Sequence, residues 1–402
     1  MSRLAELIEQ LCPDGVEYRA LGDVGVFVRG GGLQKADFVE GGMPCVHYGQ
    51  IHTRFGISTT MAVSSVSEAQ FARLKHADYG DLLIATTSED DEAVGKATAW
   101  LGEGEVAISG DMFYYRHNLE PKYVSYFFAS SLFQDQKRPY LTGAKVRRIA
   151  DKGLARIQIP VPPVEVQREI VRILDQFTTL EAELEAELEA RQAQYEYYRN
   201  QLLSYDALAS RGPVKWVKLG DIGTVKMCKR IHKKETADKG DVPFYKISSF
   251  GGAPTAFISR NQFMEYKSKY PYPKVGDLLI SASGTIGRVV RFNGEDAYFQ
   301  DSNIVWLDHD ESIVSNRFLF YLYKVISWET EGGTIKRLYN SRILKQEIPV
   351  PSFCEQQRIA DILDRFDALV NDISSGLPAE ILARRAQYEY YRDRLLSFSE
   401  KK

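Results

Sequence analysis

A long internal repeat, with a period of about 190 residues, constrains the fold of this chain more than any other feature. The first copy contains Ile159-Pro-Val-Pro162, Gln167-Arg168, Ile173-Leu-Asp-Gln-Phe177, Arg191-Gln-Ala-Gln-Tyr-Glu-Tyr-Tyr-Arg199 and Gln201-Leu-Leu-Ser204. The second copy contains, in the same order, Ile348-Pro-Val-Pro351, Gln357-Arg358, Ile362-Leu-Asp-Arg-Phe366, Arg385-Ala-Gln-Tyr-Glu-Tyr-Tyr-Arg392 and Arg394-Leu-Leu-Ser397. The chain is therefore expected to fold as two similar halves.

A longer and more divergent segment precedes each copy of the repeat. The landmarks that recur are Leu21-Gly-Asp23 with Leu219-Gly-Asp221, and Gly80-Asp-Leu-Leu-Ile84 with Gly276-Asp-Leu-Leu-Ile280. Apolar runs predict strands at 81–84, 277–280 and 303–306, and helices at 123–133 and 317–327. We predict two α/β (α+β) domains at 1–158 and 208–347, separated by near-constant helices at 159–207 and 348–402.

The near-constant segments are expected to form long helices, because Ile-Pro-Val-Pro excludes helix and an apolar heptad pattern follows it. If residues 165–205 form one helix, it is about 60 Å long. Its seam, meaning the stripe that faces a partner helix, holds Ile170, Leu174, Phe177, Leu184, Leu188, Tyr195, Tyr198, Leu202 and Tyr205, with Glu181 and Arg191 as exceptions. The second seam holds Leu363, Phe366, Val370, Leu377, Tyr388, Tyr391, Leu395 and Phe398. Two matching seams in one chain predict an antiparallel coiled coil.

The two helices differ in one place. Tyr195 lies 18 residues after Phe177, whereas Tyr388 lies 22 residues after Phe366. The first helix has the helix-forming stretch Leu180-Glu-Ala-Glu-Leu-Glu-Ala-Glu-Leu188, whose glutamates are expected to be solvated. The second has Ser374-Ser-Gly-Leu-Pro378, which predicts a kink.

Composition excludes several classes of protein. The hydrophobic content of 44% and charged content of 26% are globular values, and no apolar run reaches the length of a membrane span. Because Glu6 and Glu9 interrupt the first ten residues, we expect no signal peptide and a cytoplasmic protein. The four cysteines form no Cys-x-x-Cys pair, and Cys45, His47 and His52 supply too few ligands to favour a metal site over ordinary packing.

Charge is distributed unevenly along the chain. Its net value is −3, but residues 210–354 hold 22 basic and 15 acidic side chains, whereas residues 1–164 hold 17 and 20. A basic second domain therefore lies between acidic or neutral segments, which indicates a polyanion-binding surface that the net charge conceals.

The order and duplication of these motifs resemble the specificity subunit of type I restriction–modification enzymes over essentially the whole chain. The opening Leu11-Cys-Pro-Asp-Gly-Val-Glu-Tyr18 and the paired Gly-Asp-Leu-Leu-Ile stretches fit the same family. The Glu-Ala-Glu-Leu units resemble the tetrapeptide repeats of one of its subgroups. The resemblance implies that each variable domain is a target recognition domain, which reads one half of a split, asymmetric site in double-stranded DNA.

The resemblance also implies partners and cofactors. The helices are expected to separate the two domains and to dock two methyltransferase (modification) subunits, and restriction (motor–nuclease) subunits complete the enzyme. S-adenosylmethionine, ATP and Mg²⁺ are expected on those partners, and no cofactor, metal or catalytic residue on this chain. One more tetrapeptide would lengthen the first helix by about 6 Å, or roughly one or two base-pair rises.

The sequence lacks the motifs of a stand-alone methyltransferase or ATPase. The chain contains no Asn/Asp-Pro-Pro-Tyr/Phe motif, and Gly95-Lys96-Ala97 lacks both the upstream Gly and the Ser/Thr of a P-loop. Two other hypotheses remain open at this point. One is a restriction or methylating enzyme that acts alone, and the other is a coiled-coil adaptor that binds only protein.

Candidate DNA contacts in the second domain fall on four segments. The densest basic run, Lys226–Lys234, offers Lys229, Arg230, Lys233 and Lys234 for phosphates. The other candidates are Lys246 and Ser248, then Ser283, Thr285 and Arg288 after a predicted strand, and Lys336 and Arg337 after Gly332-Gly333. A solvated face is the alternative for the basic run, and an ordinary Gly turn is the alternative for the stretch that holds Ser283, Thr285 and Arg288.

Because the first domain is net acidic, any DNA-binding surface on it must be a local cluster of basic and polar side chains. The candidates are Arg29 and Lys35; His47, Gln50, His52 and Arg54; Thr86, Thr87 and Lys96; and Lys145, Arg147 and Arg148. The basic pair that follows Gly143 repeats the pair Lys336-Arg337 of the second domain. The acidic run Glu89-Asp-Asp-Glu92 would repel phosphate, so either it points away from DNA or one acid accepts from a cytosine amino group.

Overall fold

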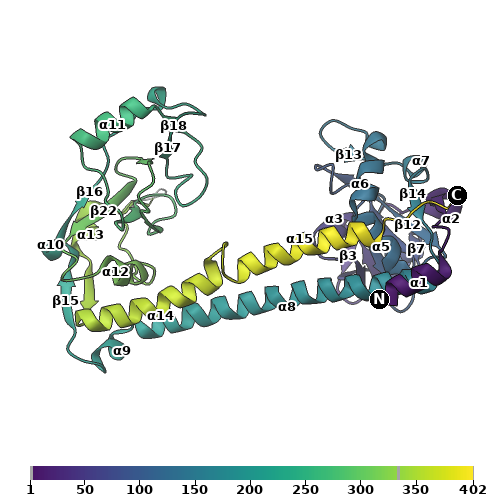
Figure 1. The fold of residues 1–402 in the computed structure, drawn as a ribbon, viewed down its shortest axis with the longest axis horizontal. Helices are drawn as coiled ribbons and strands as arrows, with labels where there is room; N and C mark the ends of the chain where they lie inside the picture. The colour runs from purple at the N-terminus through teal and green to yellow at the C-terminus, as the bar shows by residue number, and fades with distance from the viewer. Residues whose placement is uncertain (1–2, 333–335, 402) are drawn as a thin grey trace. The chain divides into compact units, whose positions relative to one another are not determined.

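The computed structural model describes residues 3–332 and 336–401. The chain forms two compact units, Met1–Glu185 with Glu380–Lys402 and Ala186–Ala379, which are described one at a time (Figure 1). Each unit combines one globular domain with about half of the long helical segments.

The globular domain of the first unit has two mixed five-stranded sheets. The first has the order β2 (Gly25–Arg29), β12 (Met112–His117), β8 (Leu82–Ala85), β10 (Ala97–Trp100) and β5 (Ser58–Thr59). The second has the order β3 (Phe38–Val39), β6 (Ser64–Val66), β4 (Met43–Val46), β11 (Val106–Ile108) and β7 (Lys75–Ala77). Two short ribbons pair β1 (Tyr18–Ala20) with β14 (Gln158–Pro160), and β9 (Thr87–Ser88) with β13 (Arg147–Arg148).

Helices cover the sheets of this unit. They are α1 (Arg3–Leu11), α2 (Leu21–Val24), α3 (Tyr48–Thr53), α4 (Glu68–Phe71), α5 (Pro121–Ala129), α6 (Ser131–Lys137) and α7 (Asp151–Leu154), with 3₁₀ turns at Lys35–Asp37 and Arg138–Tyr140. The single helix expected over 123–133 is wrong. It is divided at Ser130, whose extended backbone lets its hydroxyl cap α6 by accepting from the Phe133 N–H.

The globular domain of the second unit has smaller sheets. One has the order β16 (Gly223–Lys226), β22 (Ile304–His309), β19 (Leu278–Ser281) and β20 (Val289–Arg291), and the other β18 (Phe257–Ile258), β17 (Val242–Tyr245) and β21 (Tyr298–Phe299). A ribbon pairs β15 (Lys215–Lys218) with β23 (Glu347–Val350). Its helices are α9 (Tyr205–Ala209), α10 (Leu219–Ile222), α11 (Arg260–Lys269), α12 (Asn316–Tyr323) and α13 (Asn340–Lys345), with a 3₁₀ turn at Lys233–Glu235.

The strands predicted from the Asp-Leu-Leu-Ile stretches are central in both domains. All four residues of β8 and all four of β19 are buried, because each strand is paired on both sides and covered on both faces. This explains their continuous apolar sequence, which lacks the alternation of a strand with one wet face. The predicted α+β class is confirmed.

The long helices differ as predicted. Figure 1 shows α8 (Val164–Leu202) as an unbroken helix, whereas α14 (Phe353–Asn371) and α15 (Leu377–Leu395) are separated by a turn. In that turn the Asp372 carboxylate accepts from the Ser374 N–H and hydroxyl at 2.8 and 2.6 Å. Gly376 lies so close to α14 that a Cβ there would be 2.4 Å from the Ala368 carbonyl oxygen. The kink expected near 374–378 is confirmed.

The helices run antiparallel within each unit. In the first unit Phe177 of α8 stacks on Tyr391 of α15, with ring centroids 5.6 Å apart, and Arg385 forms ion pairs with Glu181 and Glu185. In the second unit Tyr198 of α8 packs on Phe366 of α14 at 5.9 Å. The two aromatic pairs are repeat equivalents of each other, as the predicted pseudo-twofold repeat requires.

The predicted seam needs three corrections. The helix ends at Leu202, so Tyr205 belongs to α9 and stacks on Trp216 at 5.5 Å. Tyr198 is 42% exposed despite its contact with Phe366. The most buried side chains near the helix ends are Leu203 and Leu396, each one residue beyond the predicted Leu202 and Leu395, which are only partly buried. Packing of the helix ends onto the domains displaces the seam from a strict heptad.

The glutamines correct one of the pairings between the two copies of the repeat. Gln167 donates to the Pro162 carbonyl oxygen at 2.7 Å and accepts from the Glu120 N–H at 2.9 Å. Gln356, and not Gln357, makes the equivalent bonds, to the Pro351 carbonyl oxygen at 3.1 Å and from the Ser315 N–H at 3.0 Å. The pairing of Gln167 with Gln357 is therefore wrong.

The described residues contain neither a membrane-spanning helix nor a cluster of metal ligands. Over residues 3–332 and 336–401, no helix is both long and apolar enough to cross a bilayer. Within the same residues, no three His, Cys, Asp or Glu side chains are grouped so as to hold a metal ion. Cys45 is buried in the first domain, where burial raises the pKa of its thiol to about 11.

Candidate DNA interface and domain anchors

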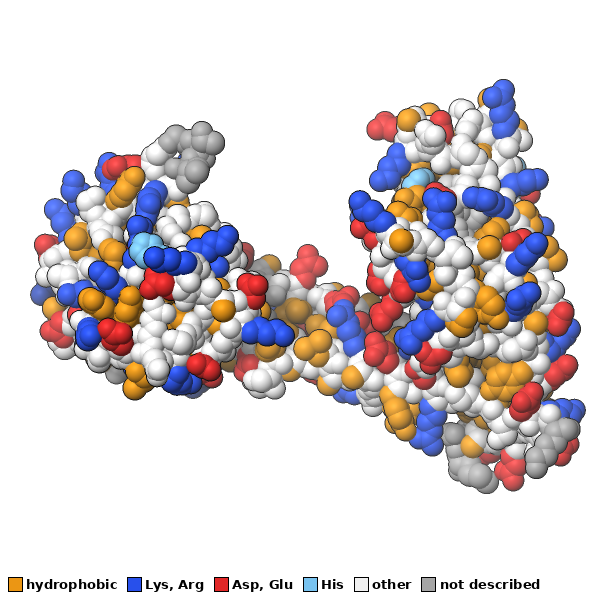
Figure 2. Space-filling view, turned by 90° about the horizontal axis from the view of Figure 1, so that it is seen from above, with side chains coloured by type: hydrophobic (Ala, Val, Ile, Leu, Met, Phe, Trp, Pro, Cys, Tyr) orange, Lys and Arg blue, Asp and Glu red, His pale blue; other side chains and the backbone are white. Residues whose placement is uncertain are grey.

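Basic side chains are spread over both globular domains rather than gathered in one patch. Figure 2 shows Lys and Arg side chains on the visible face of each domain, interspersed with Asp and Glu. The functional question is therefore which cations are held in place by the fold and which are unconstrained.

In the second domain, three predicted residues from separate segments meet at one turn, Asp301–Asn303, which leads into β22. Arg230 donates through Nε to the Asp301 carboxylate at 2.9 Å. Arg337 donates to the carbonyl oxygen and hydroxyl of Ser302 at 3.0 and 2.9 Å. The Ser283 hydroxyl donates to the Asn303 side-chain oxygen at 3.0 Å. The prediction from sequence missed this turn because its residues form no recognisable motif.

The backbone of the same turn is strained. Ser302 has φ of +53°, and it is the sole non-glycine residue in the left-handed region among the described residues. Such strain persists where surrounding contacts hold it, and it is concentrated at functional sites. The turn is therefore a fixed platform for Arg230 and Arg337.

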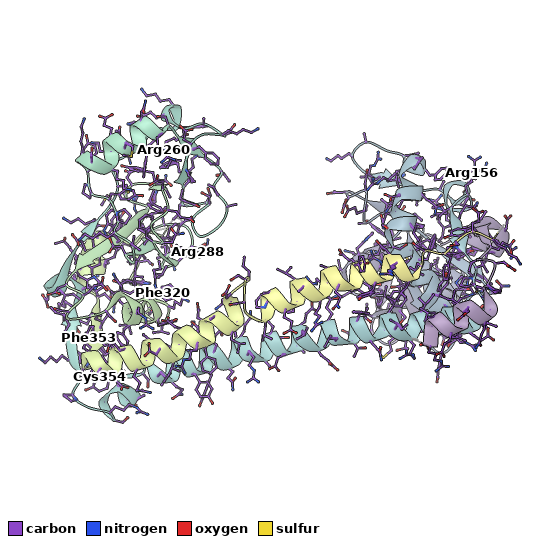
Figure 3. The ribbon with its side chains drawn as sticks, viewed as in Figure 1. Arg156, Arg260, Arg288, Phe320, Phe353 and Cys354 are labelled. Atoms are coloured by element: carbon purple, nitrogen blue, oxygen red, sulfur yellow. The ribbon has the colours of Figure 1, made fainter. Side chains whose placement is uncertain are left out.

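Neighbouring loops of the second domain supply the other predicted contacts. Arg288, labelled in Figure 3, donates to the Phe250 carbonyl oxygen at 2.7 Å, and Lys229 lies 5.2 Å from the ring centroid of Tyr270. The Ile247 N–H donates to Gln300 at 2.9 Å, which joins the loop of Lys246 and Ser248 to the Asp301–Asn303 turn. The remaining members of this set are exposed: Thr285, Lys233, Lys234 and Lys336.

The first domain has the equivalent turn, Ser109–Asp111, before β12. Arg29, the last residue of β2, donates through Nε to the Gly110 carbonyl oxygen at 3.0 Å. The Thr86 N–H donates to the Asp111 carbonyl oxygen at 3.0 Å, as the Ala282 N–H donates to that of Asn303 at 2.7 Å. These matching bonds show that the two turns are repeat equivalents.

Several predicted contacts of the first domain are brought together, but they face inward. His52 lies 3.1 Å from the Thr87 carbonyl oxygen, and Lys96 donates to the His52 carbonyl oxygen at 3.2 Å. Thr86 and Thr87 are buried, and burial lowers the pKa of both His52 and Lys96. In this structure these four residues support the fold, so direct DNA contact through their side chains is not supported.

His47 and Gln50 are also committed to local structure. The His47 ring accepts from the Gly49 N–H at 3.2 Å and so caps α3, while Gln50 accepts from the His47 N–H at 2.9 Å and donates to the Ser64 hydroxyl at 2.6 Å. Burial lowers the pKa of His47, and the nearby Lys35 acts in the same direction. The neutral ring suits its role as a cap.

The acidic run at 89–92 is fixed beside the basic pair rather than pointed away from it. Arg147 donates through Nε to Asp91 at 2.5 Å and through a terminal nitrogen to the Gly143 carbonyl oxygen at 2.5 Å. Lys137, which is buried, donates to the carbonyl oxygens of Glu92 and Val94 at 2.8 and 2.5 Å. The Asp91 carboxylate neutralises Arg147, which corrects the expectation of a free phosphate contact there.

Five of the cations predicted to contact DNA in the first domain are exposed. Lys35, Arg54, Lys145 and Arg148 are exposed, and Arg29 is exposed but held by Gly110. Arg147 and Arg148 are consecutive residues of β13, so their side chains leave opposite faces of that strand. Only one of the two can face a ligand that lies on one side.

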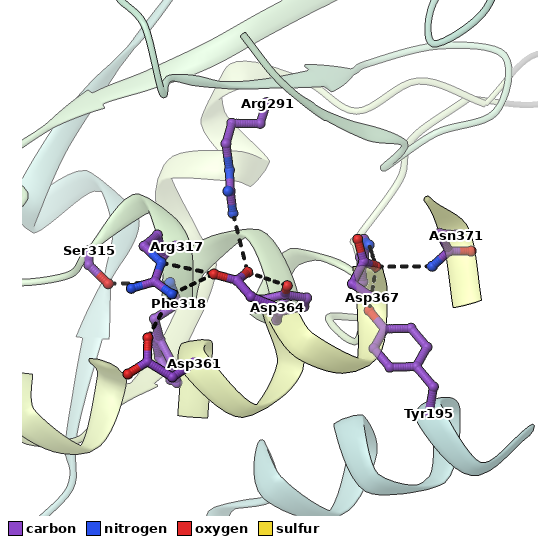
Figure 4. Close-up of polar contacts among 11 residues, drawn as sticks. Tyr195, Arg291, Ser315, Arg317, Phe318, Asp361, Asp364, Asp367 and Asn371 are labelled. Atoms are coloured by element: carbon purple, nitrogen blue, oxygen red, sulfur yellow. Dashed lines mark hydrogen bonds and ion pairs between the residues drawn. The ribbon is translucent and has the colours of Figure 1, made fainter. Parts of the chain in front are cut away.

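A cluster of ion pairs anchors the second domain to α14 (Figure 4). Asp364 accepts from Arg317 of α12 at 3.0 Å, and Tyr321 of the same helix donates its hydroxyl to Asp364. Arg317 also pairs with Asp361 at 2.7 Å. Burial, followed by the Asp364 carboxylate, raises the pKa of Tyr321, which therefore remains a neutral donor.

The first unit has the same anchor, with a lysine in place of the arginine. Asp175 of α8 accepts from Lys122 and Tyr126 of α5, both at 2.8 Å. The sequence contained a signal for this contact, because Asp175 and Asp364 both stand in the repeated Ile-Leu-Asp-x-Phe stretch. Lys122 and Tyr126 share the four-residue spacing of Arg317 and Tyr321. The prediction assigned these aspartates no role.

Each unit also exposes one pair of adjacent tyrosines on a long helix. Tyr197 and Tyr198 on α8 pack edge to face at 5.4 Å, and Tyr390 and Tyr391 on α15 do so at 5.3 Å. Tyr197 is 60% exposed and Tyr390 is 58% exposed. Their partners within each repeat, Tyr195 and Tyr388, turn inward. Burial raises the pKa of both, to about 12 for Tyr388.

A cavity of about 700 Å³ lies between the second domain and α14. Phe320 and Arg291 contribute to its wall, with the Arg291 guanidinium 4.8 Å from the Phe320 ring centroid. The two α14 carboxylates nearest the anchor are already paired, Asp364 with Arg317, and Asp367 with Lys324 at 3.3 Å and Tyr195 at 3.0 Å. The cavity therefore belongs to the same anchor.

Comparison with known proteins identifies the repeat. The family model described as "Type I restriction modification DNA specificity domain" matches residues 13–190 and again 213–383. A putative type I restriction enzyme specificity subunit of Haemophilus influenzae is 52% identical over 270 residues, 65% of this chain and 69% of that protein. A type I restriction enzyme specificity subunit of Escherichia coli is 35% identical over 273 residues, 62% of this chain and 65% of its own length.

Solved structures share the fold at low sequence identity. One, from work on complex assembly and conformational transition of the type I R-M system, has a TM-score of 0.64 at 18% identity and covers 96% of this chain and 98% of that one. The S subunit from M. genitalium has a TM-score of 0.52 at 15% identity, with coverages of 95% and 96%. The chain therefore belongs to the family of type I restriction–modification DNA specificity domains, of which it carries two copies.

Proposed function

We propose that this chain is the non-catalytic DNA-reading subunit of a type I restriction–modification complex, in which each globular domain reads one half of a bipartite asymmetric site. The observation that carries the proposal is the duplication of the turn before β12 and β22, each with an arginine fixed to it. Two similar but non-identical platforms suit two different half-sites. Arginines and backbone amides of this kind contact phosphates and base edges in major grooves.

The long helices are proposed to dock two copies of one methyltransferase subunit. The exposed pairs Tyr197/Tyr198 and Tyr390/Tyr391 support this, because they repeat the same sequence and geometry once in each unit. Exposed tyrosines are typical anchors of protein interfaces. Restriction subunits would join the complex, and S-adenosylmethionine, ATP and Mg²⁺ would reside on the partners, which would supply adenine methylation and ATP-dependent cleavage.

The first experiment is co-expression with the methyltransferase subunit of the same system, followed by purification and sequencing of the host genome for methylated adenine. A split motif with two defined halves and a fixed unread gap is the expected result. A stable complex that neither methylates nor binds DNA at low salt would favour an adaptor that binds only protein. Methylation by the purified chain with S-adenosylmethionine alone would favour a stand-alone enzyme.

The docking proposal has its own test. Tyr197→Ala and Tyr390→Ala are each expected to reduce the number of bound methyltransferase copies from two to one, measured by native mass spectrometry. Tyr79→Ala is the matched control, because Tyr79 is a 68% exposed tyrosine on the first globular domain. Unchanged stoichiometry in both helix variants would refute the tyrosine pairs as docking sites.

A further inference from the structure

Two arginines, one in each domain, are fixed by the fold in the same way. Arg230 is tied to Asp301 through Nε alone, at 2.9 Å, and Arg29 is tied to Gly110 through Nε alone, at 3.0 Å. Both arginines are exposed, 63% for the Arg230 side chain, whereas its partner Asp301 is only 17% exposed. Arg29 is the last residue of β2 and Arg230 follows β16, the strands that pair with β12 and β22. Each arginine reaches the turn that leads into that partner strand.

The bond through Nε has a chemical consequence. Guanidinium has five N–H donors, one on Nε and two on each terminal nitrogen. Since the contact uses Nε, both terminal nitrogens of Arg29 and Arg230 keep their donors unengaged by any residue at 3–332 or 336–401. The end of each guanidinium is thus a two-pronged donor on a restrained side chain, which matches the O6 and N7 acceptors of guanine in the major groove.

The other arginines at the two interfaces lack this combination. Arg147 engages Nε and both terminal nitrogens, Arg288 has one terminal nitrogen on Phe250, and Arg337 has one on Ser302. Arg54 and Arg148 are exposed, and within the described residues no hydrogen bond or ion pair restrains their guanidinium groups. Arg29 and Arg230 alone are both restrained and open at the terminal edge.

We propose that Arg230 and Arg29 each read one guanine, Arg230 in the half-site of the second domain and Arg29 in that of the first. The inference deepens the proposed function and rests on it. Asp301 is a positioning residue, because it orients Arg230 and does not itself touch the base. The two arginines come from non-equivalent positions, Arg29 within β2 and Arg230 four residues after β16, so each domain places its donor pair differently.

The test uses the complex with its methyltransferase subunits and reads the methylated motif from genome sequencing. Arg230→Gln is expected to relax one G·C pair in one half-site and to leave the other half unchanged. Arg29→Gln is expected to relax one G·C pair in the opposite half. On duplexes that carry the motif, discrimination at that pair should fall about 10- to 100-fold, as expected for the loss of one bidentate contact.

Two further variants separate base reading from other roles. Asp301→Ala should weaken discrimination at the same base pair as Arg230→Gln, and the double variant should lose little more than Arg230→Gln alone. Lys233→Gln is the matched control, an exposed cation of the same basic run, and should weaken binding equally at all sequences with a shallower salt dependence.

The outcomes are distinct. If Arg230→Gln weakens all sequences uniformly, Arg230 contacts phosphate and the proposal is wrong for that half-site. A wild-type half-site without any G·C pair refutes it for that half directly. If Arg230→Gln abolishes methylation, the variant complex is tested for binding to duplexes that carry the motif with each base pair in turn replaced. A loss confined to one G·C pair supports base reading, and a uniform loss supports phosphate contact. If the wild-type complex has no motif at all, the proposed function itself fails, and this inference fails with it.

Discussion

The hydroxyl of Tyr126 donates a 2.8 Å hydrogen bond to the carboxylate of Asp175, and the repeat places Tyr321 on Asp364 in the same way. In each unit, the helix that follows the central sheet is thus joined to a long helix by a tyrosine and a cation that share one carboxylate. The contact is made within a unit, so it fixes how each recognition domain is seated on its own portion of helix.

Removal of the shared carboxylate should destabilise its unit. Asp364→Ala leaves the Tyr321 hydroxyl buried without an acceptor and removes the main partner of Arg317. We expect a loss of roughly 2 kcal/mol in the free energy of unfolding, measured by urea denaturation. Asp361→Ala is the control. Asp361 is 58% exposed, and Arg317 is its one ion-pair partner among the described residues, so its removal should cost less than about 0.5 kcal/mol.

The corrected pairing of the glutamines can be tested by two adjacent substitutions. Gln356 is buried and makes three side-chain hydrogen bonds, with Ser315, Ile313 and Pro351. Gln356→Ala should therefore cost about 2–3 kcal/mol, since it leaves buried backbone groups without partners. Gln357→Ala alters an exposed side chain and should change the stability by about 0.5 kcal/mol or less. Equal effects would show that the pairing of Gln167 with Gln356 is wrong.

Stability of the first unit should depend on pH through His117. Burial lowers the pKa of His117 to about 4 and outweighs the opposing charge of Asp81. As pH falls from 6.5 to 4 the unfolded chain takes up a proton that the folded chain does not, so the unit loses roughly 3 kcal/mol over that range. His117→Phe should reduce the fall in stability between pH 7 and pH 4 by that amount, measured by urea titrations. An unchanged pH profile would contradict the prediction.

The turn between α14 and α15 should not tolerate a side chain at Gly376. Gly376→Ala places a methyl group 2.4 Å from the Ala368 carbonyl oxygen, so the helix ends must move apart, at a cost of about 1–3 kcal/mol. Gly56→Ala is a control, because a methyl group there would meet no atom within 4 Å. A decrease in thermal stability confined to the Gly376 variant is the expected result.

The architecture was predictable because short sequence patterns within the repeat determine where the long helices begin, continue and break. Prolines exclude helix before α8 and α14, heptads predict the long helices, and Ser374–Pro378 predicts the break between α14 and α15. The details that failed depend on tertiary packing. Ser130 divides α5 from α6, and the helix ends bury Leu203 and Leu396 because the domains pack there, which no periodicity along one helix can show.

The candidate interface was predictable only in part. Basic residues and small hydroxyls could be listed from the sequence, but their partners lie far away in it. Arg147 is neutralised by Asp91, 56 residues earlier, and Arg230 is oriented by Asp301, 71 residues later. Sequence supplies the charges, whereas the pairings that decide which charges remain available arise only when the strands are assembled.

The turn at Asp372–Gly376 also bears on how such a chain changes over generations. Tyr198 lies 21 residues after Phe177, whereas Tyr391 lies 25 residues after Phe366, yet both aromatic pairs close. The interval in the C-terminal segment is thus four residues longer, which is the length of one Glu-Ala-Glu-Leu unit of α8. Gain of one such unit by slippage during replication would bring the two segments to equal length. Under the proposed function, such a step is expected to lengthen the unread spacer of the DNA site by roughly one or two base pairs.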